Sequence, residues 1–110
     1  MGRTIDINPG DIFRDNKNPE ITRLVVGPGS EEFCDSLNCS VNGDEIKVLD
    51  LPGSFPITRI GETIKHLSPE KVEELFVKYF QEKKRKDLDS SLLEEIHRTA
   101  FSLPRRVNLP

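Results

Sequence analysis

The stretch from Ser68 to Phe80 constrains the fold of this chain more than any other part. Ser68 is a favoured N-cap residue, and Pro69 is a favoured first residue of a helix. Large apolar side chains then recur at the spacing of one helix face: Val72, Leu75, Phe76, Tyr79 and Phe80. Burial of such a stripe stabilises a helix more than its caps do. The sequence therefore predicts a helix that packs on a second surface and belongs to the core.

Residues 1–67 are expected to form the sheet on which this helix packs. In this part of the chain, short runs of β-branched and aliphatic residues alternate with Pro and Gly turn signals. Between two of these runs stands Asn42-Gly43, which favours a tight hairpin because both turn residues adopt positive φ. Residues 30–36 are polar and acidic and are expected to form a loop. The predicted strands cover residues 12–14, 21–26, 37–41, 45–51 and 55–60.

A second, shorter helix is predicted after the first one. Ser91 and Glu94 have the spacing of a capping box, and Pro104 would end the helix. Its apolar residues are Leu92, Leu93, Ile96 and Ala100. Strands followed by helices predict the α+β class: a small twisted sheet or SH3-like β-barrel followed by two C-terminal helices.

The length of 110 residues fits one domain. We expect a single α+β domain over residues 1–104, with a β-rich part at 1–67 and a helical part at 68–103. Residues 105–110 are expected to form a flexible tail.

Charge is spread unevenly along the chain, whose formal net charge is −3. Residues 1–64 carry a net charge of −5, whereas residues 65–110 carry +2. An acidic half and a basic end suit a protein that docks on another macromolecule. The predicted contact residues are Lys83, Lys84, Arg85, Lys86, Arg105 and Arg106. A second candidate is the acidic patch Glu31, Glu32 and Asp35.

Other kinds of site have little support in the sequence. Cys34 and Cys39 are too few for a disulfide scaffold and too far apart for a compact zinc motif, so we expect two thiols in a reducing, cytoplasmic setting. No metal and no cofactor are expected. No membrane segment is expected either, because no apolar run approaches the length that spans a bilayer. The carboxylates show no paired spacing typical of acid-base catalysis.

These observations favour a non-catalytic binding or regulatory module that docks on a larger protein partner. Nucleic-acid binding through the basic end is an alternative, although no aromatic residues are interleaved there for base stacking. The sequence also leaves a homodimer open.

A second alternative rests on three short stretches. Residues 9–13 (Pro-Gly-Asp-Ile-Phe), Arg23 before an aliphatic run, and the Pro56-Ile57-Thr58 tripeptide resemble segments of the MazF/PemK growth-inhibitor class. The resemblance covers about 15 residues, and Leu24 stands where the family has Pro after the Arg. It implies an SH3-like barrel that often dimerises and an endoribonuclease that cuts single-stranded RNA. Arg23 would stabilise the charge of the phosphate transition state, and Thr58 would position the phosphate.

Overall fold

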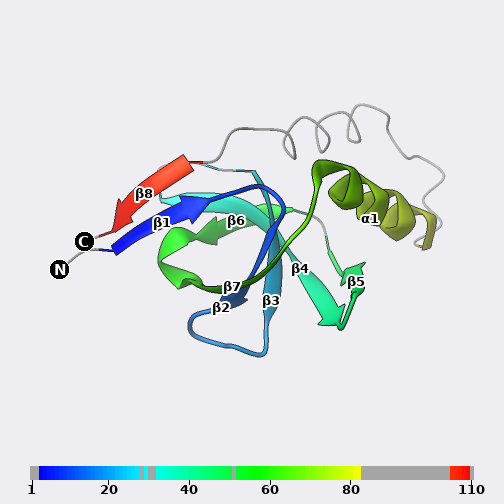
Figure 1. Cartoon of the computed structure of the whole chain (residues 1–110), viewed down its shortest axis with the longest axis horizontal. Helices are drawn as coiled ribbons and strands as arrows, with labels where there is room; N and C mark the ends of the chain where they lie inside the picture. The colour runs from blue at the N-terminus through cyan, green and yellow to red at the C-terminus, as the bar shows by residue number, and fades with distance from the viewer. Residues whose placement is uncertain (1–2, 28, 30–31, 51, 83–104, 110) are drawn as a thin grey trace.

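The computed structural model describes residues 3–27, 29, 32–50, 52–82 and 105–109, which are mostly β-strand. Strands β1 (Arg3–Ile7), β2 (Asp11–Asp15), β3 (Thr22–Gly27) and β4 (Phe33–Asn42) come first. They are followed by β5 (Glu45–Val48), β6 (Gly53–Pro56), the 3₁₀ turn η1 (Ile57–Arg59) and β7 (Ile60–His66). Helix α1 (Pro69–Glu82) and strand β8 (Arg105–Leu109) complete the described chain (Figure 1).

The predicted α+β class with two C-terminal helices is wrong. The described residues form a mostly β structure with one α-helix, α1. The second predicted helix falls on residues 83–104 and lies outside the described residues. The expected tail at 105–110 instead contains strand β8, whose residues pair with β1 from Arg3↔Leu109 to Ile7↔Arg105. Pairing between the two ends of the chain carries no local sequence signal.

The main sheet has the order β5-β4-β3-β2-β7, and all of its neighbouring strands are antiparallel. Strand β4 is the longest, and its edge away from β3 pairs with β6 in its first half and with β5 in its second half. The sheet curls so that its two ends approach each other. Lys65 on β7 donates a hydrogen bond of 3.2 Å to the carbonyl of Gly43 in the β4–β5 turn.

Side chains alternate between two buried faces of this sheet, as the period of a β-strand requires. Ile12, Leu24 and Leu37 face α1 and belong to the larger apolar cluster. Phe13, Val25 and Cys34 face the other way and join a second cluster with Phe55 and Ile57 of the β6–η1 segment. The rings of Phe13 and Phe55 lie 5.5 Å apart between centroids. The β6–η1 segment therefore folds over the second face while α1 covers the first.

The sequence predicted several local elements with shifted bounds. In the β4–β5 hairpin Asn42 pairs with Glu45, so the two turn residues are Gly43 and Asp44, with Gly43 at φ 63°. Strand β4 begins at Phe33, inside the segment predicted as a loop. The strand predicted at 55–60 is divided by η1, where the chain turns from β6 into β7. The early start of β4 reflects its pairing with the distant strand β6.

The predicted first helix is confirmed. The Ser68 hydroxyl accepts a 3.2 Å hydrogen bond from the Lys71 backbone N–H, as an N-cap does. Val72, Leu75, Phe76 and Tyr79 are buried against the sheet. No helix among the described residues has the length and apolar character needed to cross a membrane.

Replacing Phe76 with alanine tests how much this packing contributes to stability. Phe76 is fully buried in the larger cluster, so Phe76→Ala is expected to lower the free energy of unfolding by about 3–5 kcal/mol. Urea unfolding followed by circular dichroism measures this change. The exposed helix residue Lys78, changed to alanine, is the control. Equal effects of the two substitutions would show that α1 does not pack as described.

Candidate functional site

A polar cluster occupies one end of the second face of the sheet. Arg23 on β3 lies in register with Phe13 on β2 and with Asn38 on β4, so these three side chains share that face. Ser36, two residues before Asn38 on β4, is fully buried beside them. We call Arg23, Ser36, Asn38 and Asp50 the arginine site.

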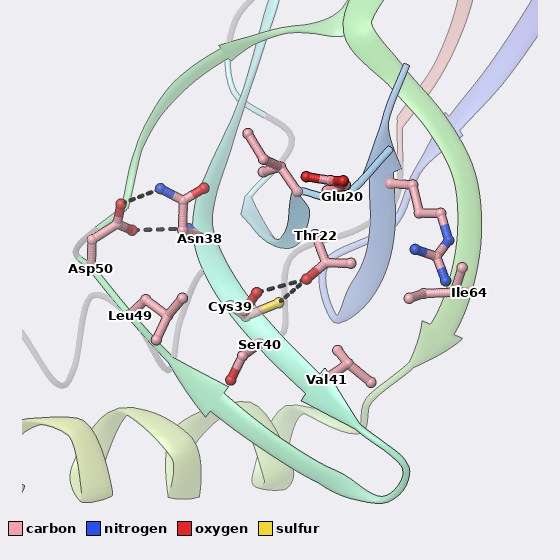
Figure 2. A pocket seen from close by; sticks show the side chains of 11 residues that line it. Glu20, Thr22, Asn38, Cys39, Ser40, Val41, Leu49, Asp50 and Ile64 are labelled. Atoms are coloured by element: carbon pink, nitrogen blue, oxygen red, sulfur yellow. Dashed lines mark hydrogen bonds between the residues drawn. The ribbon is translucent and has the colours of Figure 1, made fainter. Parts of the chain in front are cut away.

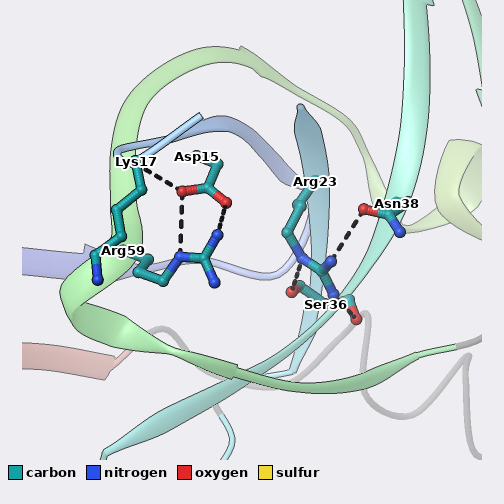
Figure 3. Close-up of polar contacts among 6 residues, drawn as sticks. All are labelled: Asp15, Lys17, Arg23, Ser36, Asn38 and Arg59. Atoms are coloured by element: carbon teal, nitrogen blue, oxygen red, sulfur yellow. Dashed lines mark hydrogen bonds and ion pairs between the residues drawn. The ribbon is translucent and has the colours of Figure 1, made fainter. Parts of the chain in front are cut away.

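Three hydrogen bonds hold the guanidinium of Arg23 in place (Figure 3). Its Nε–H donates to Ser36 Oγ at 2.9 Å, and Nη2 donates to the Ser36 carbonyl at 3.0 Å. Nη1 donates to Asn38 Oδ1 at 3.0 Å. A guanidinium has five N–H donors, so two remain to meet a further acceptor once these three bonds are made.

Asp50 fixes the side chain of Asn38 from the other side. The Asn38 amide nitrogen Nδ2 donates to Asp50 Oδ2 at 2.7 Å, and the Asn38 backbone N–H donates to Asp50 Oδ1 at 2.9 Å. These bonds assign Oδ1 of Asn38 to Arg23. Asp50, which follows strand β5, therefore orients the guanidinium of Arg23 through the side chain of Asn38.

The charge of Arg23 is partly desolvated and has only neutral groups bonded to it. Burial lowers the pKa of Arg23, and the nearby Asp50 carboxylate opposes this effect without reversing it. Within the part of the chain that the structure describes, Arg23 forms no ion pair, because Ser36 and Asn38 are uncharged. A half-buried cation with neutral neighbours favours an anionic ligand.

A second arginine lies close to the arginine site. Arg59 in η1 forms a two-point ion pair with the buried Asp15 on β2 through its Nε and Nη2. The guanidinium carbons of Arg23 and Arg59 lie 4.4 Å and 5.1 Å from the centre of the Phe55 ring. Cation–π contact with one aromatic ring therefore brings the two positive charges together.

An open groove adjoins the arginine site on the first face, where α1 does not cover the sheet. Its volume is about 570 Å³. Figure 2 shows Leu49 and Asp50 on one side, Ile64 on the other, and Cys39 and Thr22 between them. The remaining lining residues are Arg14, Glu20, Ile21, Asn38, Ser40 and Val41. Asn38 and Asp50 belong both to the groove and to the arginine site.

The structure places the residues predicted for the endoribonuclease alternative in different settings. Arg23 is held within the sheet, whereas Thr58 is exposed in η1 beside Arg59. No hydrogen bond joins Arg23 to Thr58 among the described residues. The partners that the structure gives to Arg23 are instead Ser36 and Asn38.

The predicted docking residues are described only in part. Lys83, Lys84, Arg85, Lys86 and Glu31 lie outside the described residues, and Arg105 opens strand β8. Arg106 forms an exposed ion pair with Asp6, 2.9 Å from Nε to Oδ1, which raises the pKa of Arg106 and lowers that of Asp6. Of the acidic patch, Glu32 is exposed and Asp35 is half-buried.

The two thiols and His66 belong to no cluster of metal-ligating side chains among the described residues. Burial raises the pKa of Cys34 and raises that of Cys39 to about 11, which keeps both thiols protonated at neutral pH. His66 Nδ1 lies 2.5 Å from Asp11 Oδ1 at the end of β7. Among the described residues no three His, Cys, Asp or Glu side chains gather as metal ligands would.

Comparison of the chain with protein-family models, with curated proteins and with solved structures finds no match. The resemblance to the MazF/PemK class therefore stays a prediction.

The ion pair of Asp15 predicts a pH-dependent contribution to stability. Burial alone would raise the pKa of Asp15, but hydrogen bonds from the Lys17 backbone and from Arg59 lower it below 3.8. A lowered carboxyl pKa stabilises the fold above pH 3.8, and this stability is lost as the pH falls through the folded-state pKa. Asp15→Asn should therefore lose less stability than wild type between pH 7 and pH 3. Urea unfolding at both pH values measures this, with the exposed Asp44→Asn as control. An unchanged pH response in Asp15→Asn would contradict the role of this pair.

Thiol labelling tests the burial of Cys39. With a pKa of about 11, only roughly a thousandth of the thiol is ionised at pH 8. In the variant Cys34→Ala, native protein should react with an aromatic disulfide reagent at least about a hundredfold more slowly than protein in urea. Rapid labelling of the native variant would show that Cys39 is accessible and ionised.

Proposed function

We propose that this protein is an endoribonuclease that acts on single-stranded RNA and holds a backbone phosphate at Arg23. The observation that carries the proposal is the fixed, half-buried guanidinium of Arg23, which among the described residues is bonded to neutral groups alone and keeps two N–H donors for a further acceptor. Phosphate oxygens match the planar fork of a guanidinium and would neutralise its charge. The resemblance to the MazF/PemK class supports RNA as the polymer.

The reaction needs no resident metal. The ribose 2′-oxygen attacks the adjacent phosphorus, the bond from phosphorus to the 5′-oxygen breaks, and a 2′,3′-cyclic phosphate forms. The 2′-hydroxyl proton passes to solvent, and the departing 5′-oxygen takes a proton from solvent. Arg23 stabilises the extra negative charge that develops on the phosphate oxygens. Ser36 and Asn38 act as positioning residues because they hold the guanidinium before the substrate arrives.

The charge of the whole chain sets a limit on how RNA binds. Net charge is −3, so long-range attraction of RNA is weak and local contacts must supply the affinity. Arg59 lies on the same aromatic ring, but its charge is paired with Asp15, so the contact with the phosphate is assigned to Arg23. A non-catalytic module that docks on a protein partner through residues 83–86 stays a prediction, because those residues lie outside the described chain.

Cleavage of a long single-stranded RNA in a chelator-containing buffer tests the proposal. We expect discrete fragments with 2′,3′-cyclic phosphate ends, and no cleavage of DNA of the same sequence, because DNA lacks the attacking hydroxyl. Arg23→Lys keeps the charge but loses the fork and should slow cleavage by about 10² to 10³. Lys47→Gln, which removes an exposed positive charge that is paired with Glu82 and not with the arginine site, is the matched control and should cleave at the wild-type rate.

Thermal unfolding of each variant separates loss of fold from loss of chemistry. Intact RNA with folded wild-type protein would refute the endoribonuclease. Equal cleavage by wild type and folded Arg23→Lys would refute the role of Arg23.

A further inference from the structure

We infer that Gly53 is a specificity-determining residue of the arginine site, because its missing side chain leaves the space in which an RNA backbone phosphate meets Arg23. This inference rests on the proposed function and names the position that admits the substrate. Its grounds are the register of β6 against β4, the contacts of the Arg23 guanidinium and the open space at Gly53.

Strand β6 places Gly53 directly opposite Ser36 on β4. Partners in an antiparallel pair present their side chains to the same face of the sheet. Two residues along, Cys34 pairs with Phe55, and both of these residues belong to the cluster on the second face. A side chain at position 53 would therefore point to the second face, where the guanidinium of Arg23 lies.

The guanidinium of Arg23 contacts two neighbours of Gly53. It donates to the hydroxyl of Ser36 at 2.9 Å and to the carbonyl of Ser36 at 3.0 Å. Its central carbon lies 4.4 Å from the centre of the Phe55 ring. Ser36 is the cross-strand partner of Gly53, and Phe55 is the next residue of β6 on the same face. The space that a side chain of residue 53 would occupy therefore adjoins the arginine site.

This space is open in the described part of the chain. Apart from the two chain neighbours of Gly53, no described atom lies within 4 Å of the point where its Cβ would stand. Gly53 is exposed, whereas Ser36 opposite it is fully buried. Solvent therefore reaches the second face at Gly53, beside a guanidinium whose three described hydrogen bonds leave two N–H donors.

The backbone does not itself require glycine at position 53. At Gly10, by contrast, φ is 100° and a side chain would meet the carbonyl of Leu67. Gly53 lies in strand β6 and does not have positive φ. Glycine weakens a strand, and β-branched residues are favoured there. A ligand that needs the space beside Arg23 gives a reason for glycine that the backbone does not.

The size of the ligand decides how strongly this space matters. The oxygens of a phosphate match the fork of a guanidinium. A backbone phosphate carries a ribose on each side, so it needs more room beside Arg23 than inorganic phosphate does. A side chain at position 53 should therefore exclude RNA more strongly than it excludes inorganic phosphate.

Binding of a non-cleavable oligonucleotide to two neighbouring variants tests the inference. The probe is a fluorescein-labelled 2′-O-methyl RNA octamer that contains all four bases, and fluorescence anisotropy with the full chain at pH 7.5 and fixed salt gives its affinity. Gly53→Val should bind the octamer at least about tenfold more weakly than wild type. Ser54→Val is the matched control, because Ser54 is exposed and alternation along β6 points it to the other face. It should bind within about twofold of wild type.

Urea unfolding separates a steric block from a folding defect. Because valine favours a strand more than glycine does, Gly53→Val should unfold at the same urea concentration as wild type or at a higher one. Gly53→Ala gives the same test with a single methyl group and an expected loss of about two- to threefold in octamer affinity. Inorganic phosphate, followed by the NMR shift of the Arg23 Nε–H, should lose less affinity in Gly53→Val than the octamer does.

The outcomes separate this inference from the proposed function. Equal octamer affinity in wild type and folded Gly53→Val, or an equal loss in Ser54→Val, would overturn the inference even if wild type cuts RNA. If wild type cuts no RNA but Gly53→Val alone weakens octamer binding, the endoribonuclease is refuted and the phosphate opening at Gly53 is supported. If wild type neither binds the octamer nor cuts RNA, both fail.

Discussion

Burial of strand β4 on both faces and pairing along both of its edges is the constraint on which the rest of the structure depends. One edge pairs with β3, and the other pairs first with β6 and then with β5. Leu37 contributes to the cluster under α1, while Cys34 contributes to the cluster under Phe55. Because its buried residues contribute to both apolar clusters, the position of β4 fixes both the arginine site and the groove.

The polar end of the second face is organised by charge as well as by packing. Asp15 is buried and paired with Arg59, so the fold depends on this ion pair being complete. Arg23 lies on the same aromatic ring but has neutral partners. The contrast between a compensated and an uncompensated arginine distinguishes the structural pair from the candidate site. The N–H donors of Arg23 are already oriented, so little reorganisation accompanies binding of an anion.

The sequence predicts those parts of the fold that depend on local signals. The Ser68 cap and the Val72 to Tyr79 stripe lie within one helix, and the helix forms as predicted. The turn of the β4–β5 hairpin has Gly43 at positive φ, and the sequence predicts the position of this turn to within one residue. Strand β8 and the first residues of β4 are different, because their pairing partners lie far away in the chain.

The candidate site was predictable only at Arg23. Asn38, Ser36 and Asp50 are ordinary polar residues in the sequence, and the register of β3 against β4 is what brings them to the guanidinium. Register depends on the burial pattern of the whole sheet. Phe55 and Arg59 carried no signal either, because the turn η1 that orients them divides a stretch with strand-like composition.

Nitrogen-15 NMR of the arginine Nε–H groups tests the central claim most directly. The Nε–H of Arg23 is bonded to Ser36 Oγ, so its signal should be resolved in the free protein and should vanish in Arg23→Lys. Titration with a 2′-O-methyl RNA oligonucleotide, whose blocked 2′-oxygen prevents cleavage, is expected to shift this signal in a saturable way. The signal of Arg106, which is paired with Asp6 where β1 meets β8, should stay in place. An Arg23 signal that does not move at saturating oligonucleotide would contradict phosphate binding at this arginine.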